Sequence, residues 1–213
     1  MYQFRIFPKG EYFHICNKSI SNYHIFRNKN WINRFLTTIN YCNNEERKIS
    51  LSKALRKPLN LPNILDIFPY QIVHILAYCI MSDHYHLLVK ILKEYSLSKY
   101  ISNIENSYSK YYNKVNSRKG PLWQSRFRST HITDNNTLLH VHRYIHLNPT
   151  TAGLVIKPED WKWSSYNSYI SDPQILSHTK EISITSMKIY KQFVDNQIDY
   201  QRTIKGIRRK LLE

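Results

Sequence analysis

Two histidines, His84 and His86, are spaced so that both imidazoles can act on one ligand. They open an apolar run that continues Leu-Leu-Val, which is typical of a β-strand. Because side chains alternate between the faces of a strand, residues two positions apart point the same way. A shared metal ion would give one nitrogen of each ring a partner. The alternative interpretation is a pair of partly exposed, hydrogen-bonded strand residues.

A second group of polar side chains lies on a predicted helix. Residues 134–149 begin with capping residues, and we expect the helix to end before Pro149. Three of its side chains recur at every fourth position and share one stripe: His140, Tyr144 and Asn148. A tyrosine hydroxyl one turn from an amide oxygen, facing an imidazole pair, is a layout for metal-assisted chemistry. His142 and His146 have the same spacing on another stripe, and we interpret them as structural.

The elements that must position these residues follow from the apolar pattern. Residues 71–91 form two extended runs broken at Ser82-Asp83, which predicts a hairpin. The other expected elements are a strand opening residues 12–26, helices over 29–43 and 95–116, and a strand within 122–132. This order predicts an α+β fold with a ferredoxin-like antiparallel sheet. We expect helices packed on one face of the sheet, the paired histidines on a central strand and Tyr144 on a following helix.

Composition and charge point to a polyanionic partner. The formal net charge is +16 in 213 residues, and the hydrophobic content of 42% suits a globular fold. Nucleic acid is the leading candidate and an anionic membrane the second. No apolar run approaches the roughly 18 residues of a membrane-spanning helix, and the N-terminus does not read as a signal peptide. Three widely separated cysteines favour neither a disulfide framework nor a zinc ribbon, so we expect a reducing cytoplasm.

The most basic window of the chain lies between Glu105 and Asp134, where no acidic residue occurs. Cations interleaved with aromatic rings are suited to single-stranded nucleic acid, whose phosphates and unpaired bases they can contact. The alternative is a solvated basic helix end with core aromatics. The residues that we expect to contact DNA are Lys110, Lys114, Arg118, Trp123, Gln124, Arg126 and Arg128.

Four motifs occur in order: DHYHLLV, GPLWQSRFRS, RYIHLNPTTAGLV and WKWSSY. In order and approximate spacing they resemble the single-tyrosine HUH transposases, within them the REP-associated tyrosine transposase branch, over roughly residues 10–170. The resemblance implies that His84 and His86 are metal ligands and that Tyr144 is the nucleophile. Asn148 lies where the family has its third, polar ligand. The implied metal is Mg²⁺ or Mn²⁺, although the donor set alone does not distinguish these from Zn²⁺.

The resemblance also implies a reaction and its substrate. Tyr144 would attack single-stranded DNA beside a hairpin, giving a 5′-phosphotyrosine and a free 3′-hydroxyl, as a transposase does. The candidates for accepting its proton are the metal, a metal-bound water and His140. One alternative is a domesticated, non-catalytic protein that binds hairpin DNA or RNA. Another is a ferredoxin-like RNA-binding protein, which would leave the paired histidines unexplained.

The chain departs from the family pattern at two places. Ser82-Asp83 replaces the more usual Pro-Asn before the first histidine. Asp83 either orients a metal ligand or shapes the turn, and we favour the role in the turn. Asn17-Lys18-Ser19 replaces Asn-Arg-Gly, which puts a DNA contact there in doubt. We expect a transposase domain over residues 1–170 and a basic, helical extension over 171–213. The oligomer would be a monomer or a homodimer.

Overall fold

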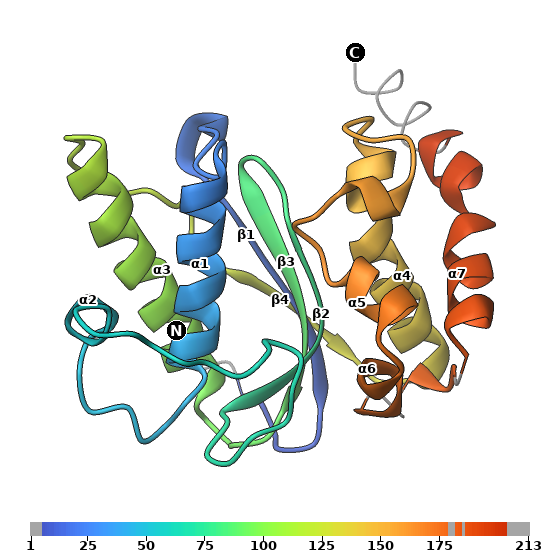
Figure 1. Ribbon diagram of the computed structural model, residues 1–213, viewed down its shortest axis with the longest axis horizontal. Helices are drawn as coiled ribbons and strands as arrows, with labels where there is room; N and C mark the ends of the chain where they lie inside the picture. The colour runs from blue at the N-terminus through green and yellow to red at the C-terminus, as the bar shows by residue number, and fades with distance from the viewer. Residues whose placement is uncertain (1–5, 179–181, 185, 204–213) are drawn as a thin grey trace.

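The computed structural model of the chain describes residues 6–178, 182–184 and 186–203. A four-stranded antiparallel sheet in the order β2-β3-β1-β4 runs through its centre (Figure 1). The strands are β1 (Tyr12–Lys18), β2 (Val73–Ile80), β3 (His84–Ile91) and β4 (Arg128–Ile132). The longer helices are α1 (Lys29–Cys42), α3 (Leu97–Val115), α4 (Asn135–Thr151) and α7 (Met187–Asp195). The shorter helices are η1 (Ile20–Asn22), α2 (Leu51–Ala54), η2 (Pro158–Asp160), α5 (Tyr166–Ser171) and α6 (Pro173–His178). The predicted α+β, ferredoxin-like arrangement is confirmed.

The β2–β3 hairpin places the two histidines inside the sheet. The amide of Met81 donates to the carbonyl of His84 at 2.9 Å, which closes the turn through Ser82 and Asp83. β3 pairs with β2 on one side and with β1 on the other, so it is a central strand as predicted. His86 lies opposite Cys16 of β1, a pairing that the register of the strands sets.

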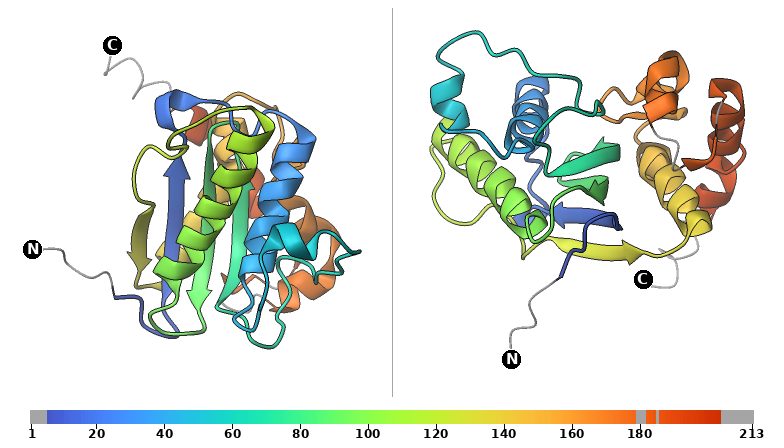
Figure 2. Two further views of the ribbon diagram at one scale, coloured as in Figure 1. Left: turned by 90° about the vertical axis from the view of Figure 1, so that its left-hand side faces the viewer. Right: turned by 90° about the horizontal axis from the view of Figure 1, so that it is seen from below.

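One face of the sheet is covered by α1 and α3, which Figure 2 shows side by side. The side chain of Asn28 accepts a hydrogen bond from the amide of Trp31 and so caps the start of α1. Phe35 of α1 is fully buried and packs against Tyr108 of α3 and Tyr85 of β3. Truncating a buried phenylalanine of this kind costs about 3–5 kcal/mol. This core holds β3 from the side opposite to its histidines.

The other face carries α4, with α5 and α7 packed against it (Figures 1 and 2). Helices therefore cover both faces of the sheet, which adds a layer to the single-face packing expected from the sequence. Asp134 caps α4 by accepting from the amide of Thr137 at 2.8 Å.

The expected end of α4 before Pro149 was wrong, because the helix continues to Thr151. Proline lacks an amide hydrogen and costs the most in a helix interior, whereas here it lies in the last turn. The chain then turns at Gly153, whose φ of +73° is a left-handed conformation that favours glycine.

The WKWSSY motif closes the outer edge of β2. The amide of Ile80 donates to the carbonyl of Trp163 at 2.8 Å, and the indole of Trp161 donates to the carbonyl of Ile80 at 3.1 Å. Ser164 forms a bridge with Cys79. The structural role expected for these tryptophans is confirmed, since they pair and pack along a strand edge that would otherwise lack partners.

Two further expectations meet the structure in part. Of the strand expected within residues 122–132, only the last five residues, Arg128–Ile132, form a strand. Residues 122–127 form a loop beside the end of β1, where the amide of Gln124 donates to the carbonyl of Lys18 at 2.9 Å and Trp123 forms a bridge with Ser19. Of the expected extension, α7 packs on α4 and α5, while residues 204–213 lie outside the described residues. The division into two domains stays a prediction. Among the described residues no helix is both long and apolar enough to cross a membrane.

Candidate active site

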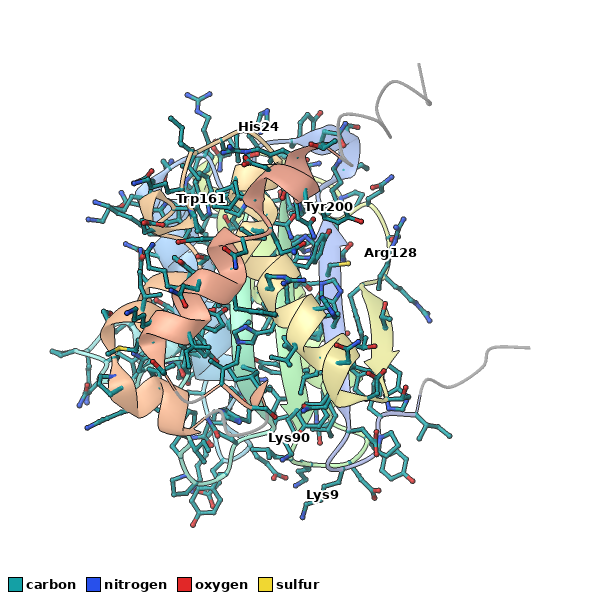
Figure 3. The ribbon with its side chains drawn as sticks, turned by 90° about the vertical axis from the view of Figure 1, so that its right-hand side faces the viewer. Lys9, His24, Lys90, Arg128, Trp161 and Tyr200 are labelled. Atoms are coloured by element: carbon teal, nitrogen blue, oxygen red, sulfur yellow. The ribbon has the colours of Figure 1, made fainter. Side chains whose placement is uncertain are left out.

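A cavity opens between the sheet and α4. Figure 3 looks onto this side, where α4 and α7 cross in front of the strands and Arg128 marks the start of β4. The residues that line the cavity are Cys16, Asn17, Lys18, His84, His86, Gln124, Ser125, Arg128 and Tyr144. The structure thus brings His84, His86 and Tyr144 together, as the sequence predicted, although they come from two separate elements.

His84 is held by a carboxylate. Its Nδ1 lies 2.6 Å from Oδ1 of Asp83, and Oδ2 of Asp83 lies 3.3 Å from Nζ of Lys18. Burial alone would raise the pKa of Asp83, but the hydrogen bonds and charges of His84 and Lys18 lower it below its usual range. An ionised carboxylate can only accept, so the proton of a neutral His84 is on Nδ1 and its Nε2 has a free lone pair. Asp83 therefore contacts a site histidine as well as forming the turn.

His86 is held by a second imidazole. Its Nδ1 lies 2.9 Å from Nε2 of His14 on β1, and the two rings are stacked. Burial lowers the pKa of His14 to about 4, and burial together with His14 and His84 lowers that of His86 well below its ordinary value. Both rings are neutral at pH 7, so one proton is shared between the two facing nitrogens. When His86 Nδ1 carries that proton, its Nε2 is free to bind a metal.

Tyr144 approaches the histidines from α4. Its ring centre lies 5.7 Å from that of His86 and 6.1 Å from that of His14, edge to face in both cases. The side chain is 38% exposed, which leaves it accessible to a substrate in the cavity.

The opposite stripe of α4 is fixed by buried polar bonds. His146 contacts the hydroxyl of Tyr190 on α7 through Nδ1 and Oγ of Ser165 through Nε2, while Nδ1 of His142 lies 2.9 Å from the Tyr190 hydroxyl. A hydroxyl has one proton, so Tyr190 donates to one imidazole and accepts from the other. The structural interpretation of His142 and His146 is confirmed, because all three side chains are fully buried.

A buried carboxylate supports the site from the other face of the sheet. Glu105 of α3 accepts from Nδ2 of Asn17 at 2.7 Å and from the hydroxyl of Tyr85 at 2.8 Å. Burial raises the pKa of Glu105, and these two hydrogen bonds oppose the rise. Tyr85 lies between the two site histidines in the chain, so the bond from Tyr85 to Glu105 fixes the strand that carries them.

The predicted third ligand and proton acceptor lie apart from this group. Asn148 is not among the residues that line the cavity, and its Nδ2 donates to the carbonyl of Tyr144 at 3.2 Å. His140 is exposed, and its Nδ1 lies 2.7 Å from a guanidinium nitrogen of Arg143. The roles of both residues stay predictions.

The residues expected to contact DNA divide into three groups. Gln124 and Arg128 line the cavity, whereas Lys110 and Lys114 are exposed on α3 and Arg126 is exposed on the loop before β4.

The third group holds the loop. Arg118 donates to the carbonyl of Pro121 at 2.6 Å, and Trp123 donates to the carbonyl of Glu105 at 3.2 Å. The indole of Trp123 also packs against Tyr85 and Phe35. Both side chains therefore position the segment that carries Gln124.

Sequence reasoning missed the contribution of β1. His14, Cys16 and Lys18 alternate along this strand and face the same side as the β3 histidines, with Cys16 directly opposite His86. Ligand atoms of His14, Cys16 and His86 all lie within 4.8 Å of one another. The sequence contains a pattern that could have indicated this contribution, because His14, Cys16 and Lys18 occur at every second position. The pattern points to the site only once β1 is known to pair with β3.

The donor set fits a divalent metal. His84 and His86 each have Nδ1 occupied by a neighbour, which leaves Nε2 as the ligand atom that metal-binding histidines commonly use. Neutral imidazoles are the form that binds, and burial keeps His86 neutral.

Comparison with known proteins identifies the family of this chain. The family model "Transposase IS200 like" matches residues 42–148, half of the chain. The chain therefore belongs to the IS200-like transposase family. A Haemophilus influenzae protein described as a REP-associated tyrosine transposase is 27% identical over 110 residues, which span 47% of this chain and 61% of that protein. A solved structure of a REP-associated tyrosine transposase bound to a REP hairpin has a TM-score of 0.55 at 17% identity, over 81% of this chain and 87% of that one.

The two relatives indicate the branch of the family and the fold. Both are described as REP-associated tyrosine transposases, in agreement with the resemblance drawn from the four motifs. The solved structure shows that the fold is shared. The chain spans about three fifths of the curated relative that it matches.

Proposed function

We propose that this protein is a metal-dependent endonuclease and strand transferase of single-stranded DNA that cuts beside a hairpin. The observation that carries the proposal is the position of Tyr144, whose ring stands 5.7 Å from that of His86 in a cavity also lined by His84. A nucleophile beside two imidazoles is an arrangement suited to metal-assisted phosphodiester cleavage.

The ligands would be Nε2 of His84 and Nε2 of His86, with Asn148 as a third ligand once its side chain turns from the carbonyl of Tyr144. Mg²⁺ or Mn²⁺ is the proposed ion. When bound, it supplies positive charge that stabilises the negative charge developing on the phosphate. Asp83 and His14 would orient the two imidazoles and fix their protons away from the ligand atoms.

Tyr144 would form a bond to phosphorus as the bond from phosphorus to the 3′ oxygen breaks. The product is a 5′-phosphotyrosine and a free 3′-hydroxyl, so the tyrosine gives up a proton and the departing oxygen takes one up. Because the phosphotyrosine is itself a phosphodiester, another 3′-hydroxyl can reverse the step, which is strand transfer.

The cations around the cavity support DNA as the substrate. Lys18 and Arg128 line it together with Gln124, and we propose that they contact the backbone and bases of the single strand at the cleavage site. Lys110, Lys114 and Arg126 lie outside the cavity and would contact the hairpin. Arg118 and Trp123 would act indirectly, by holding the loop before β4.

The decisive experiment incubates the protein with labelled hairpin DNA whose single-stranded flanks vary in sequence, in Mg²⁺ or in EDTA. A denaturing gel then detects a covalent adduct. We expect an adduct in Mg²⁺ that is lost in Tyr144→Phe and retained in Tyr200→Phe, which alters another exposed tyrosine. Tight DNA binding without an adduct under any metal or sequence would replace the proposal with a non-catalytic hairpin-binding function.

A further inference from the structure

The cavity contains a sulfur that the proposed reaction does not use. Cys16 is half-buried and lines the cavity, whereas Cys42 and Cys79 are buried in the core. It lies directly opposite His86 on one side and Arg128 on the other. Magnesium does not bind thiolates, so the hard-metal chemistry proposed above gives Cys16 no role.

The neighbours of Cys16 are themselves metal-ligating groups. Ligand atoms of His14, Cys16 and His86 lie within 4.8 Å of one another. Two nitrogens and one sulfur form a borderline-soft donor set of the kind that Zn²⁺ prefers, with tetrahedral geometry and one position left open.

We propose that His14, Cys16 and His86 form a second metal site, selective for zinc-class ions, which closes the catalytic site by taking His86 away from it. The closing effect rests on the proposed function, whereas the binding of the ion does not. We call these three residues the β1 site.

The two ring nitrogens need little movement, and the thiol of Cys16 would close on them from within 4.8 Å. Nε2 of His14 and Nδ1 of His86 are 2.9 Å apart, joined by one shared proton. Two nitrogens bound to one tetrahedral zinc ion at its usual bond lengths are about 3.3 Å apart. A small opening of the two rings would therefore let the ion replace the proton. The shared proton would move to the other nitrogen of its own ring, and the thiol proton of Cys16 would pass to solvent, so binding would release one proton.

The exclusion of the catalytic ion follows from the chemistry of imidazole. A neutral ring that binds a metal through Nδ1 carries its proton on Nε2, and it then has no lone pair for a second ion there. His86 can therefore serve the β1 site through Nδ1 or the catalytic site through Nε2, but not both. His84 and Asn148 belong only to the catalytic set, while His14 and Cys16 belong only to the β1 site.

The matched variants are Cys16→Ala and Cys79→Ala. Both cysteines lie opposite His86 on neighbouring strands, but only Cys16 opens to the cavity. Titration with Co²⁺ in place of Zn²⁺ reports thiolate ligation as a near-ultraviolet charge-transfer band, with no need for activity. We expect the band in the unchanged protein, in Cys79→Ala and in His84→Ala, and its loss in Cys16→Ala. Competition with a chromophoric chelator should show Zn²⁺ affinity falling at least about tenfold in Cys16→Ala.

A second measurement uses the unchanged protein. Zn²⁺ should protect Cys16 from alkylation, read by mass spectrometry, while excess Mg²⁺ should not. Absence of the cobalt band, its persistence in Cys16→Ala, or alkylation of Cys16 unaffected by Zn²⁺ would overturn the β1 site. In the adduct assay Zn²⁺ should inhibit the unchanged protein more strongly than Cys16→Ala. If no adduct ever forms but the cobalt band does, the proposed function fails and the β1 site stands.

Discussion

Replacing Asp83 tests whether the carboxylate orients a ligand or only shapes the hairpin turn. Its Oδ1 lies 2.6 Å from Nδ1 of His84, and its side chain is 15% exposed. Asp83→Ala removes the acceptor, so the proton of His84 is no longer held on Nδ1 and the ring is free to rotate. Asp83→Asn retains an acceptor oxygen without its charge.

The size of the effect follows from these contacts. Loss of an outer partner of a metal-binding histidine typically lowers metal affinity about 10- to 100-fold. The side chain of His84 is 28% exposed, so water can replace part of the lost bond. We therefore expect the lower end for Asp83→Ala, about tenfold or about 1.4 kcal/mol. For Asp83→Asn we expect about threefold, half of that free energy.

The assay is a calorimetric titration with Mn²⁺, accompanied by a thermal melt of each variant. Lys18→Ala is the control, because it removes the other partner of Asp83 and leaves the bond to His84 in place. It should lower the affinity less than either Asp83 variant does. If Asp83→Ala binds Mn²⁺ as tightly as the unchanged protein while its melting temperature falls, the carboxylate serves the turn alone and the orienting role is refuted.

Three further predictions concern acid stability, the polar core and DNA contacts. Burial lowers the pKa of His142 to about 3 from an ordinary 6.5, so its contribution to the free energy of unfolding is complete above pH 6.5. That contribution should fall by about 3 kcal/mol at pH 4, measured by urea denaturation, and a His142→Gln variant with an equally steep acid limb would contradict the assignment. Tyr190→Phe should cost about 1–3 kcal/mol, because it leaves buried imidazole nitrogens without their partner. Tyr200→Phe, which alters a side chain that is 59% exposed, should be neutral, and equal costs would argue against the buried cluster. Arg128→Glu should weaken binding of single-stranded DNA and flatten its salt dependence, whereas Lys9→Glu, at the other end of the sheet in Figure 3, should not.

Local patterns in the sequence were enough to predict the main elements. The hairpin at Ser82-Asp83 and the helices near residues 29–43 and 95–116 follow from the apolar pattern and the polar turn pair, which are local signals of a few residues. The convergence of the paired histidines with Tyr144 was also predictable, although through the family motifs rather than through spacing alone.

What the sequence did not reveal depends on register and packing. The link between His14 and His86 and the pairing of Cys16 with His86 arise because β1 lies beside β3, and that register is a tertiary property. Trp123 is an aromatic residue of the kind on which bases stack, but its partly buried indole packs against the core. A proline in the interior of a helix usually ends it, and we expected α4 to end before Pro149. The helix continues to Thr151 because Pro149 lies in its last turn, where a proline is tolerated.

The buried hydrogen bonds of His142 and His146 limit how two copies of this chain could exchange α4, the helix that carries Tyr144. Exchange of α4 alone would leave His142 and His146 without their hydrogen-bond partners, since these are Tyr190 of α7 and Ser165 just before α5. Each orphaned buried imidazole nitrogen would cost about 1–3 kcal/mol. The smallest exchangeable unit is then residues 135–195, which would travel together, with the connection between β4 and α4 as the hinge. A dimer built in this way would keep its polar core intact and would bring Tyr144 of one copy to the histidines of the other.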